Sequence, residues 1–471
     1  MSSGEGQQDA APFRTSPTGP RVAPARATDF AAAAPSSPAQ VIDGYPAAFK
    51  WRRLASVIFF IALVLGTGIR AYRDMSRPDA WSFWKDQYVS PSLSSALLAD
   101  APIPGPGERH AVLAVSGRIG PAAAVWFRDR INESHLKPGD VVLLSSPGGN
   151  LEQGLFIGNM LREMSAVARV GRTIVNDCGF EPQSSELCLK LKRSGRELAG
   201  NLSTRGAQCH SACPYMMLGA TKREIAPDAI LGVHSPKIVL RYSGSGEPSS
   251  EMIGAATQRA VLRGDRLLSD YVVRMGIDGE LLDVARRTRF EDMHVLTRDQ
   301  IFRFGIDRRE FVETSWMFEN LGRHLIRKSA LARTVDGKAW RTLQWRLFCL
   351  NPEQFQLEFH RPAVWNTTTA VLPVVSISSG AAKPLTFAFP PAKLVASEAW
   401  QLRLPKASIL AMAGLSELDL TETANALDGR RSSHAEKLSG EGLARSLDNL
   451  VAVCPAPGQT APQQSGLQKV L

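Results

Sequence analysis

Three short segments of this chain carry residue types that together could catalyse acyl transfer. Residues 146–149 (Ser-Pro-Gly-Gly) follow an apolar run, and their two glycines let backbone N–H groups point toward a developing oxyanion. Ser211 precedes another apolar run and could attack a carbonyl, and His234, 23 residues later, could take the proton. A nucleophile, a base and oxyanion donors in this order predict a serine hydrolase site.

Each segment alone also has an ordinary structural explanation. Residues 146–149 could be a plain strand-to-helix turn, Ser211 a plain helix N-cap, and His234 a structural residue at the end of a strand. Residues 209–213 hold two cysteines and a histidine, but no fourth metal ligand is apparent, so we expect neither a metal nor another cofactor. The catalytic interpretation therefore requires the three segments to meet in space.

The elements that would position these segments follow an α/β pattern. Apolar runs at 111–115 and 141–144 predict buried strands, and residues 121–133 between them predict a helix. A strand, a helix and a strand at this spacing indicate a parallel sheet with helices packed on it. After the second strand, Asn150 is a good N-cap for the next helix, with Gln153 three residues on.

A second helix should begin at or just after Ser211. Pro214 is tolerated only in the first turn of a helix, and an apolar run follows it. The amide of Ala212 would then face the same oxyanion as an amide of the glycine pair. The candidate oxyanion donors are therefore the N–H groups of Gly148, Gly149 and Ala212.

In this form the segments resemble the Clp-type serine peptidase proteolytic subunit and the wider Clp/crotonase fold. That family has a strand ending in Ser-Pro-Gly-Gly, a serine at a helix start, and a histidine followed closely by a proline. The matching residues here are 146–149, Ser211-Ala212 and His234-Ser235-Pro236. Residues 218–227 and 296–306 resemble the family's connecting and closing segments, so the resemblance covers roughly residues 108–310.

The resemblance implies that Ser211 is the nucleophile and His234 the general base, with the N–H groups named above as the oxyanion hole. Counting to the family's aspartate lands on Met293, and a shift of one residue would supply Asp292 to orient the imidazole. Otherwise the site is a Ser–His dyad or is degenerate, and Asp292 is a solvated surface residue. Relatives with this fold include acyl-CoA-handling enzymes and inactive proteins, so the fold alone does not settle function.

One departure from the family is an insertion at residues 172–208, which could cap the cleft, restrict the substrate or block oligomer packing. It holds a basic stretch at 190–196, which is typical of a solvated face.

The six cysteines suit an oxidising compartment. Cys178 and Cys188 bracket a loop-like segment, and Cys349 and Cys454 are isolated in the C-terminal region, so these are the two predicted disulfides. The two cysteines beside Ser211 are buried thiols, or one of them is bridged to the insertion, or Cys209 is an alternative nucleophile.

The chain of 471 residues has room for two or three domains, and its net charge of +10 comes without a nucleic-acid-binding motif. Residues 54–69 lack charges and have aromatic and basic residues at both ends, which predicts a transmembrane helix. A signal peptide and a buried core helix are the alternatives. The predicted organisation is therefore a disordered segment (1–49), a transmembrane helix (51–72), a membrane-proximal linker (73–107), a Clp/crotonase-like α/β domain (108–320), a small β-rich domain (335–456) and a disordered tail (457–471).

These features predict a membrane-anchored serine hydrolase, and specifically a peptidase, that acts on a peptide or protein substrate. The cysteines favour a single-pass protein of the inner (cytoplasmic) membrane with its large domain in the periplasm. Two alternatives stay open: a catalytically inactive Clp-like scaffold or binding protein, and acyl-CoA chemistry. No nucleic acid is expected as a partner, and the sequence leaves open whether the chain forms a homo-oligomer.

Overall fold

The computed structural model forms two units, Met1–Tyr72 and Arg73–Leu471. The residues that the structure describes are 47–76, 79–98, 111–178, 182–194, 196–240, 247–321, 323–334, 336–362, 374–378, 385–387, 392–393, 397–425 and 431–454. The predicted disordered segments therefore lie outside the described residues, except for 47–49.

The first unit contains most of a long apolar helix, α1 (Ala47–Met75). Its stretch Leu54–Arg73, of 20 residues, is long and apolar enough to cross a membrane by length and composition. No acidic or basic residue interrupts residues 54–69. The predicted apolar helix is thus present, and it extends a few residues beyond both predicted ends.

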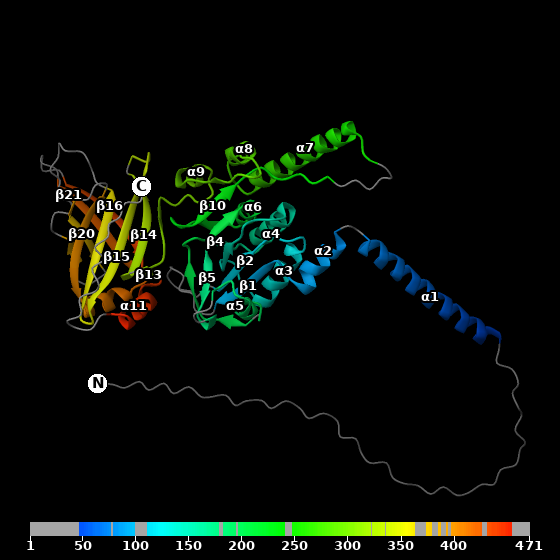
Figure 1. The fold of residues 1–471 in the computed structure, drawn as a ribbon, viewed down its shortest axis with the longest axis horizontal. Coiled ribbons are helices and arrows are strands. Elements are labelled where there is room, and N and C mark those ends of the chain that lie inside the picture. Colours follow the sequence, from blue (N-terminus) through cyan, green and yellow to red (C-terminus); the bar gives the residue numbers. More distant parts are fainter. Residues whose placement is uncertain are drawn as a thin grey trace, which may run out of the picture. The chain divides into compact units, whose positions relative to one another are not determined.

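The core of the second unit is a six-stranded sheet in the order β6-β1-β2-β3-β4-β9. Figure 1 labels β1, β2 and β4 of this sheet. Four neighbouring strands are parallel: β2 (Val112–Gly117), β3 (Val141–Ser145), β4 (Val167–Val170) and β9 (Lys222–Glu224). The predicted parallel sheet is confirmed. β1 (Leu93–Leu98) is antiparallel to β2 and parallel to β6 (Glu197–Leu198), so the sheet extends into the segment predicted to be a linker.

The continuous apolar runs of the parallel strands are explained by burial on both faces of the sheet. In β2, Leu113 and Val115 join the larger core cluster, whereas Val112 and Ala114 join a smaller cluster on the opposite face. β3 alternates in the same way. On the larger side lie α3 (Ala123–Ser134), α4 (Leu151–Glu163) and α6 (Ala212–Leu218). Because successive side chains of a strand point to opposite faces, a sheet covered on both sides needs apolar residues at every position.

The insertion covers the smaller side of the sheet. Cys178, Cys188 and Leu198 pack there against residues of β2 and β3. Its elements are β5 (Arg172–Val175), η2 (Asn176–Cys178), α5 (Glu186–Lys192), β6 and β7 (Gly200–Ser203). The predicted disulfide Cys178–Cys188 is formed within it.

A three-stranded sheet, β11-β10-β8, and several helices complete the α/β core. The strands are β8 (Gln208–His210), β10 (Ile230–Val233) and β11 (His294–Val295), and the helices are α2 (Ala80–Trp84), a π-helix η1 (Lys85–Val89), α7 (Ser250–Arg274), α8 (Glu280–Arg287) and α9 (Arg298–Arg303). α7, a long helix of 25 residues, is drawn in green in Figure 1.

The C-terminal part is β-rich, as predicted, but its first strand begins at Phe311 rather than after 335. A seven-stranded sheet has the order β12-β14-β15-β16-β20-β19 with β13 on β14, and a four-stranded sheet has the order β18-β17-β21-β22. The predicted disulfide Cys349–Cys454 joins β15 to the residues after α11. The elements are β12 (Phe311–Glu313), β13 (Met317–Leu321), β14 (Arg323–Arg333), β15 (Trp340–Asn351), β16 (Gln354–Pro362), β17 (Val374–Ser378), β18 (Leu385–Phe387), β19 (Ala392–Lys393), β20 (Ser397–Pro405), α10 (Lys406–Ala413), β21 (Glu417–Asn425), β22 (Arg431–Ser439) and α11 (Leu443–Ala452).

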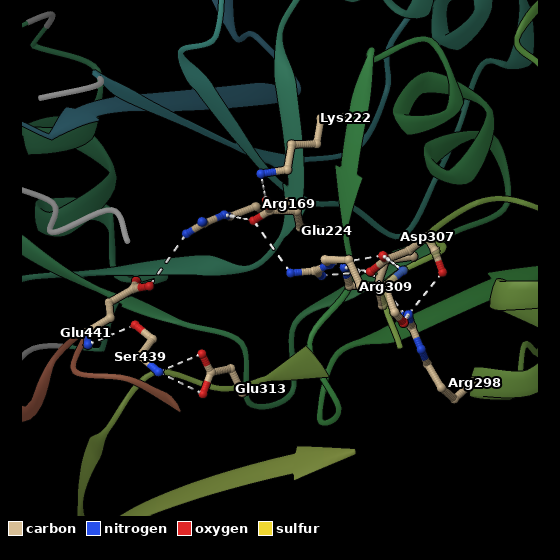
Figure 2. Close-up of polar contacts among 10 residues, drawn as sticks. Arg169, Lys222, Glu224, Arg298, Asp307, Arg309, Glu313, Ser439 and Glu441 are labelled. Carbon is tan, nitrogen blue, oxygen red and sulfur yellow. Dashed lines mark hydrogen bonds and ion pairs between the residues drawn. The ribbon is translucent and has the colours of Figure 1, made fainter. Parts of the chain in front are cut away.

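A chain of buried ion pairs connects the α/β core to this β-rich part (Figure 2). Arg169 of β4 pairs with Glu224 of β9 at 2.5 Å and with Glu441 of the β-rich part at 3.7 Å. Asp307, whose side chain is 1% exposed, pairs with Arg309 at 2.7 Å and with Arg298 at 3.1 Å. These contacts join the end of the α/β core to the start of the β-rich sheet through paired rather than isolated charges.

Candidate active site

Ser211 lies between β8 and α6 in a backbone conformation that is rare for a residue with a side chain. Its φ is 60° and its ψ is −108°, and its N–H donates to the Gly232 carbonyl oxygen at 2.9 Å. Although Ser211 occupies the N-cap position of α6, its side chain makes no capping hydrogen bond. The hydroxyl is therefore not used in the role that the ordinary structural explanation gives it.

The pairing of β8 with β10 brings His234 next to this turn. The two strands are parallel, with His210 opposite Gly232, so continuing the register places Ser211 beside Val233 and Ala212 beside His234. Neighbouring strands lie about 4.8 Å apart, so the two residues that follow these strands start close together, and both line the same cleft. Among the described residues, no hydrogen bond joins the two side chains, as is common in catalytic sites without a bound substrate.

The hydrogen bond that His234 does make defines its tautomer. Its Nδ1 lies 2.7 Å from the backbone oxygen of Ser235, and a carbonyl oxygen can only accept. Nδ1 therefore carries a proton, and in the neutral ring Nε2 is the nitrogen left to accept one. His234 is 8% exposed, and its ring lies nearly perpendicular to that of Phe290, with 5.0 Å between the centroids.

Gly148 and Gly149 make the turn beside the serine possible. Gly148 has φ 95°, and a Cβ on it would lie 2.5 Å from the Cβ of Ser211. Gly149 has φ 142°, and a Cβ there would collide with the carbonyl oxygen of Ile119. Both glycines thus adopt conformations that other residues avoid, at points where the backbone packs closely.

Among the described residues, the N–H of Gly149 takes no part in the hydrogen bonds between this turn and Ile119. The Ile119 N–H donates to the Gly148 carbonyl oxygen at 2.9 Å, and the Asn150 N–H donates to the Ile119 carbonyl oxygen at 2.8 Å. Neither bond uses the N–H of Gly149, which lies between the two. The N–H of Ala212 is the first of α6 and precedes the helical hydrogen bonds. Asn150 caps α4 through the Gln153 N–H at 3.1 Å, as predicted.

A cleft with a volume of about 1100 Å³ brings these groups together. Gly149, Ser211, Ala212 and His234 all line it. Four of the residues predicted for the site therefore border one space, and Gly148 supports it from behind Ser211. A hydroxyl, an imidazole and two N–H groups around one cleft have the chemical capacity for acyl transfer.

One wall of the cleft comes from the segment predicted to be a linker. Ser82, Lys85, Asp86, Ser90 and Ser92 line it. Asp86 is 6% exposed and accepts hydrogen bonds from the N–H groups of Ser92 at 2.9 Å and Ala122 at 3.0 Å, which fixes this wall against the start of α3. Sequence reasoning missed Asp86, because a single aspartate in an aromatic segment carries no distinguishing pattern. Capping the cleft was one of three roles considered for the insertion, and none of the described residues that line the cleft comes from it.

Among the described residues, no hydrogen bond joins Asp292, the predicted third triad member, to His234. Its carboxylate pairs with Arg289 at 2.9 Å, and 55% of its side chain is exposed. The Nδ1 that an aspartate would orient is instead bonded to the Ser235 carbonyl oxygen. The structure thus gives the Asp292 prediction no supporting contact, and the role of Asp292 stays a prediction.

The cysteines beside Ser211 form a disulfide with each other, Cys209–Cys213, rather than remaining thiols or bridging to the insertion. Within the described part of the chain, no group of three or more metal-ligating side chains comes together. His210, between Cys209 and the serine, has a lowered pKa, chiefly because it is partly buried and also because it lies near His234. A neutral His210 does not repel a proton arriving on His234.

Comparisons with known proteins add three weak structural similarities. No protein-family model matches the chain, and no curated protein matches it. A mutant of the 1510-N membrane-bound stomatin-specific protease has 15% identity and a TM-score of 0.24, over 41% of this chain and 75% of that one. A ClpP1 mutant from Listeria monocytogenes has 15% identity and a TM-score of 0.25, over 42% and 88%. Invasion associated protein B from Bartonella henselae has 12% identity and a TM-score of 0.22, over 30% and 91%. At TM-scores this low, the similarities carry no argument about function.

Proposed function

We propose that this chain is a membrane-anchored serine hydrolase, and specifically a peptidase, built on a Clp-like core. Ser211 attacks the carbonyl carbon of a peptide bond, and His234 accepts the hydroxyl proton at Nε2. The N–H groups of Gly149 and Ala212 hold the oxyanion. His234 then returns the proton to the leaving amine, and water hydrolyses the acyl-enzyme by the reverse sequence.

The single observation that carries this proposal is the strained Ser211 with an uncommitted hydroxyl at the cleft. A non-glycine residue with φ 60° and ψ −108° persists only where its surroundings impose that conformation, and such residues cluster at functional sites. The strained residue here is a serine, and it borders the same cleft as His234 and as Gly149 and Ala212, whose N–H groups would hold the oxyanion.

The proposed site is a dyad rather than a triad. The Ser235 carbonyl oxygen takes the place of a carboxylate in holding the imidazole, since it fixes the proton on Nδ1. A carbonyl stabilises a developing imidazolium less than a carboxylate does, so we expect a slower enzyme than one with a full triad.

A fluorophosphonate probe, which reacts with activated serines, tests the proposal. We expect the full-length protein to be labelled on Ser211, and the labelling to vanish in Ser211→Ala and to fall steeply in His234→Ala. Ser165→Ala is the matched control, because Ser165 is an exposed serine with φ 52° that does not line the cleft. An absence of labelling in the folded wild-type protein would leave an inactive scaffold as the better description.

A further inference from the structure

The turn that presents Ser211 is closed by a covalent bond. Cys209 lies two residues before the serine in β8, Cys213 lies two residues after it in α6, and a disulfide joins them with their Cα atoms 5.1 Å apart. Both cysteine side chains are fully buried. The proposed nucleophile is therefore the central residue of a five-residue covalent loop.

The remaining contacts of Ser211 hold it from two directions. Its N–H is bonded to Gly232 of β10, and its Cβ packs against Gly148. α6 itself is packed into the core, with every residue of Ala212–Leu218 buried. The disulfide adds a covalent tie between a residue of the strand and a residue in the first turn of the helix.

We propose that the Cys209–Cys213 disulfide is a positioning element for the nucleophile. It holds the strand and the helix at the angle that keeps Ser211 in its strained conformation, aims the hydroxyl at the cleft, and keeps the Ala212 N–H beside it. Without the bond, Ser211 relaxes toward an ordinary backbone conformation and the hydroxyl leaves the line of attack. This inference rests on the proposed function.

The position of the bond distinguishes it from the other two disulfides. Cys178–Cys188 lies within the insertion, in the cluster on the opposite face of the sheet, and Cys349–Cys454 lies in the β-rich part. None of these four residues lines the cleft. They supply matched controls, since breaking them removes a covalent bond without touching the serine turn.

One tryptic peptide of the wild-type protein reports both the state of this bond and the labelling of the serine. Cleavage after Arg205 and Lys222 yields residues 206–222, which contain Cys209, Ser211 and Cys213. The full-length protein is partly reduced under native conditions, exposed briefly to a fluorophosphonate probe, then denatured, alkylated and digested. Mass spectrometry counts the probe on peptides with the intact disulfide and on peptides with two alkylated cysteines.

We expect the labelled fraction to be roughly 100-fold lower on the reduced peptide, the loss that a small misplacement of a catalytic group causes. Equal labelled fractions on the two forms would overturn the positioning role and leave the hydrolase proposal intact. No probe on either form would instead contradict the proposed function, so the two failures are distinguishable.

A double variant gives an independent measurement. In Cys209→Ala/Cys213→Ala we expect the maximal labelling rate to fall roughly 100-fold, while the probe concentration for half-maximal rate changes little. In Cys178→Ala/Cys188→Ala both should stay at the wild-type level. A folded Cys209→Ala/Cys213→Ala protein that labels at the wild-type rate would show that the bond is merely structural. If that variant does not fold, the peptide experiment on the wild-type chain decides.

Discussion

At the scale of single residues, the site depends on backbone N–H groups whose direction is set by two glycines. Gly149 has φ 142°. Its N–H is not used in the hydrogen bonds that Gly148 and Asn150 make with Ile119. An alanine there would be strained, and its Cβ would collide with the carbonyl oxygen of Ile119. The peptide unit would have to rotate, which would turn the N–H away from the cleft.

Gly149→Ala should therefore lower the maximal rate of fluorophosphonate labelling. Loss of one oxyanion donor costs roughly 100- to 1000-fold in rate. Gly276→Ala is the control, because Gly276 also has a positive φ, 71°, but a Cβ there meets nothing within 4 Å. Labelling of a folded Gly149→Ala protein at the wild-type rate would show that the Gly149 N–H does not stabilise the oxyanion.

A second residue-scale prediction concerns the third member of the site. Because Asp292 pairs with Arg289 on the surface and Nδ1 of His234 is bonded to Ser235, we expect Asp292→Asn to label at the wild-type rate. In a true triad, the corresponding change costs roughly 10⁴-fold. A loss of that size, measured as the rate constant of labelling, would show that Asp292 reaches the imidazole during the reaction.

At this scale, the sequence predicts residues that a local pattern marks, but not contacts that depend on an unusual backbone conformation. Ser211, His234 and Gly149 could be proposed as site residues because local patterns mark them, such as a glycine pair after a strand or a serine before a helix, and the three border one cleft. The Cys209–Cys213 bond could not be found, because four-residue spacing fits a disulfide only where the backbone turns sharply between the two residues. The turn includes Ser211, whose positive φ no propensity predicts.

At the scale of elements, the α/β part was largely predictable because its strands are apolar on both faces. The runs at 111–115 and 141–144 became β2 and β3, and the interval between them became α3. β1 was not predictable, because its sequence, Leu-Ser-Ser-Ala-Leu-Leu, is short and partly polar and owes its strand to pairing with β2 and β6. This tertiary pairing is also what carries residues 82–92 to the cleft.

The contacts around Asp307 allow an element-scale prediction with a defined pH dependence. Burial alone would raise the pKa of Asp307, but hydrogen bonds and charge from Arg309 and Arg298 lower it below its ordinary value. The carboxylate also accepts from the Ile225 N–H at 3.0 Å, which ties β9 to the segment that enters the β-rich part. Asp307→Asn keeps the shape of the side chain but leaves two arginines without their buried partner.

We expect Asp307→Asn to lower the free energy of unfolding by about 3–5 kcal/mol near pH 7, as for other broken buried ion pairs. A lowered pKa stabilises the folded state above the unfolded-state value of about 3.9, and this contribution is lost as the pH falls through the folded-state value. The difference between variant and wild type should thus shrink below about pH 4. Urea denaturation followed by circular dichroism at several pH values measures it.

The control for this prediction is Asp283→Asn. Asp283 pairs with Arg286 on the surface of α8, with 56% of its side chain exposed. Exposed pairs contribute little, so we expect almost no change in its unfolding midpoint at any pH. A similar response from both variants would mean that the Asp307 cluster contributes no more than an ordinary surface pair.

At the scale of the whole molecule, the distribution of cysteines relative to the apolar helix bears on topology. All six cysteines lie beyond residue 177, and all six are in disulfides, whereas residues 1–72 contain none. Disulfides persist in oxidising compartments, and a helix such as Leu54–Arg73 allows the two ends of a chain to lie in different compartments. We infer that the second unit is exported while the first residues stay in the cytoplasm.

This topology predicts the redox state of the cysteines in intact cells. When thiols are trapped with acid and alkylated, we expect all six cysteines of the wild-type chain to be protected. Leu63→Arg/Val64→Arg places two charges in the middle of the apolar stretch, at a cost of roughly 2.5–3.5 kcal/mol for each. The second unit should then remain in a reducing compartment, its cysteines should become alkylated, and the chain should appear in the soluble fraction. Alkylation of all six cysteines in the wild-type protein would show that the second unit lies in a reducing compartment. The Cys209–Cys213 bond that we propose to position Ser211 would then be absent in the cell.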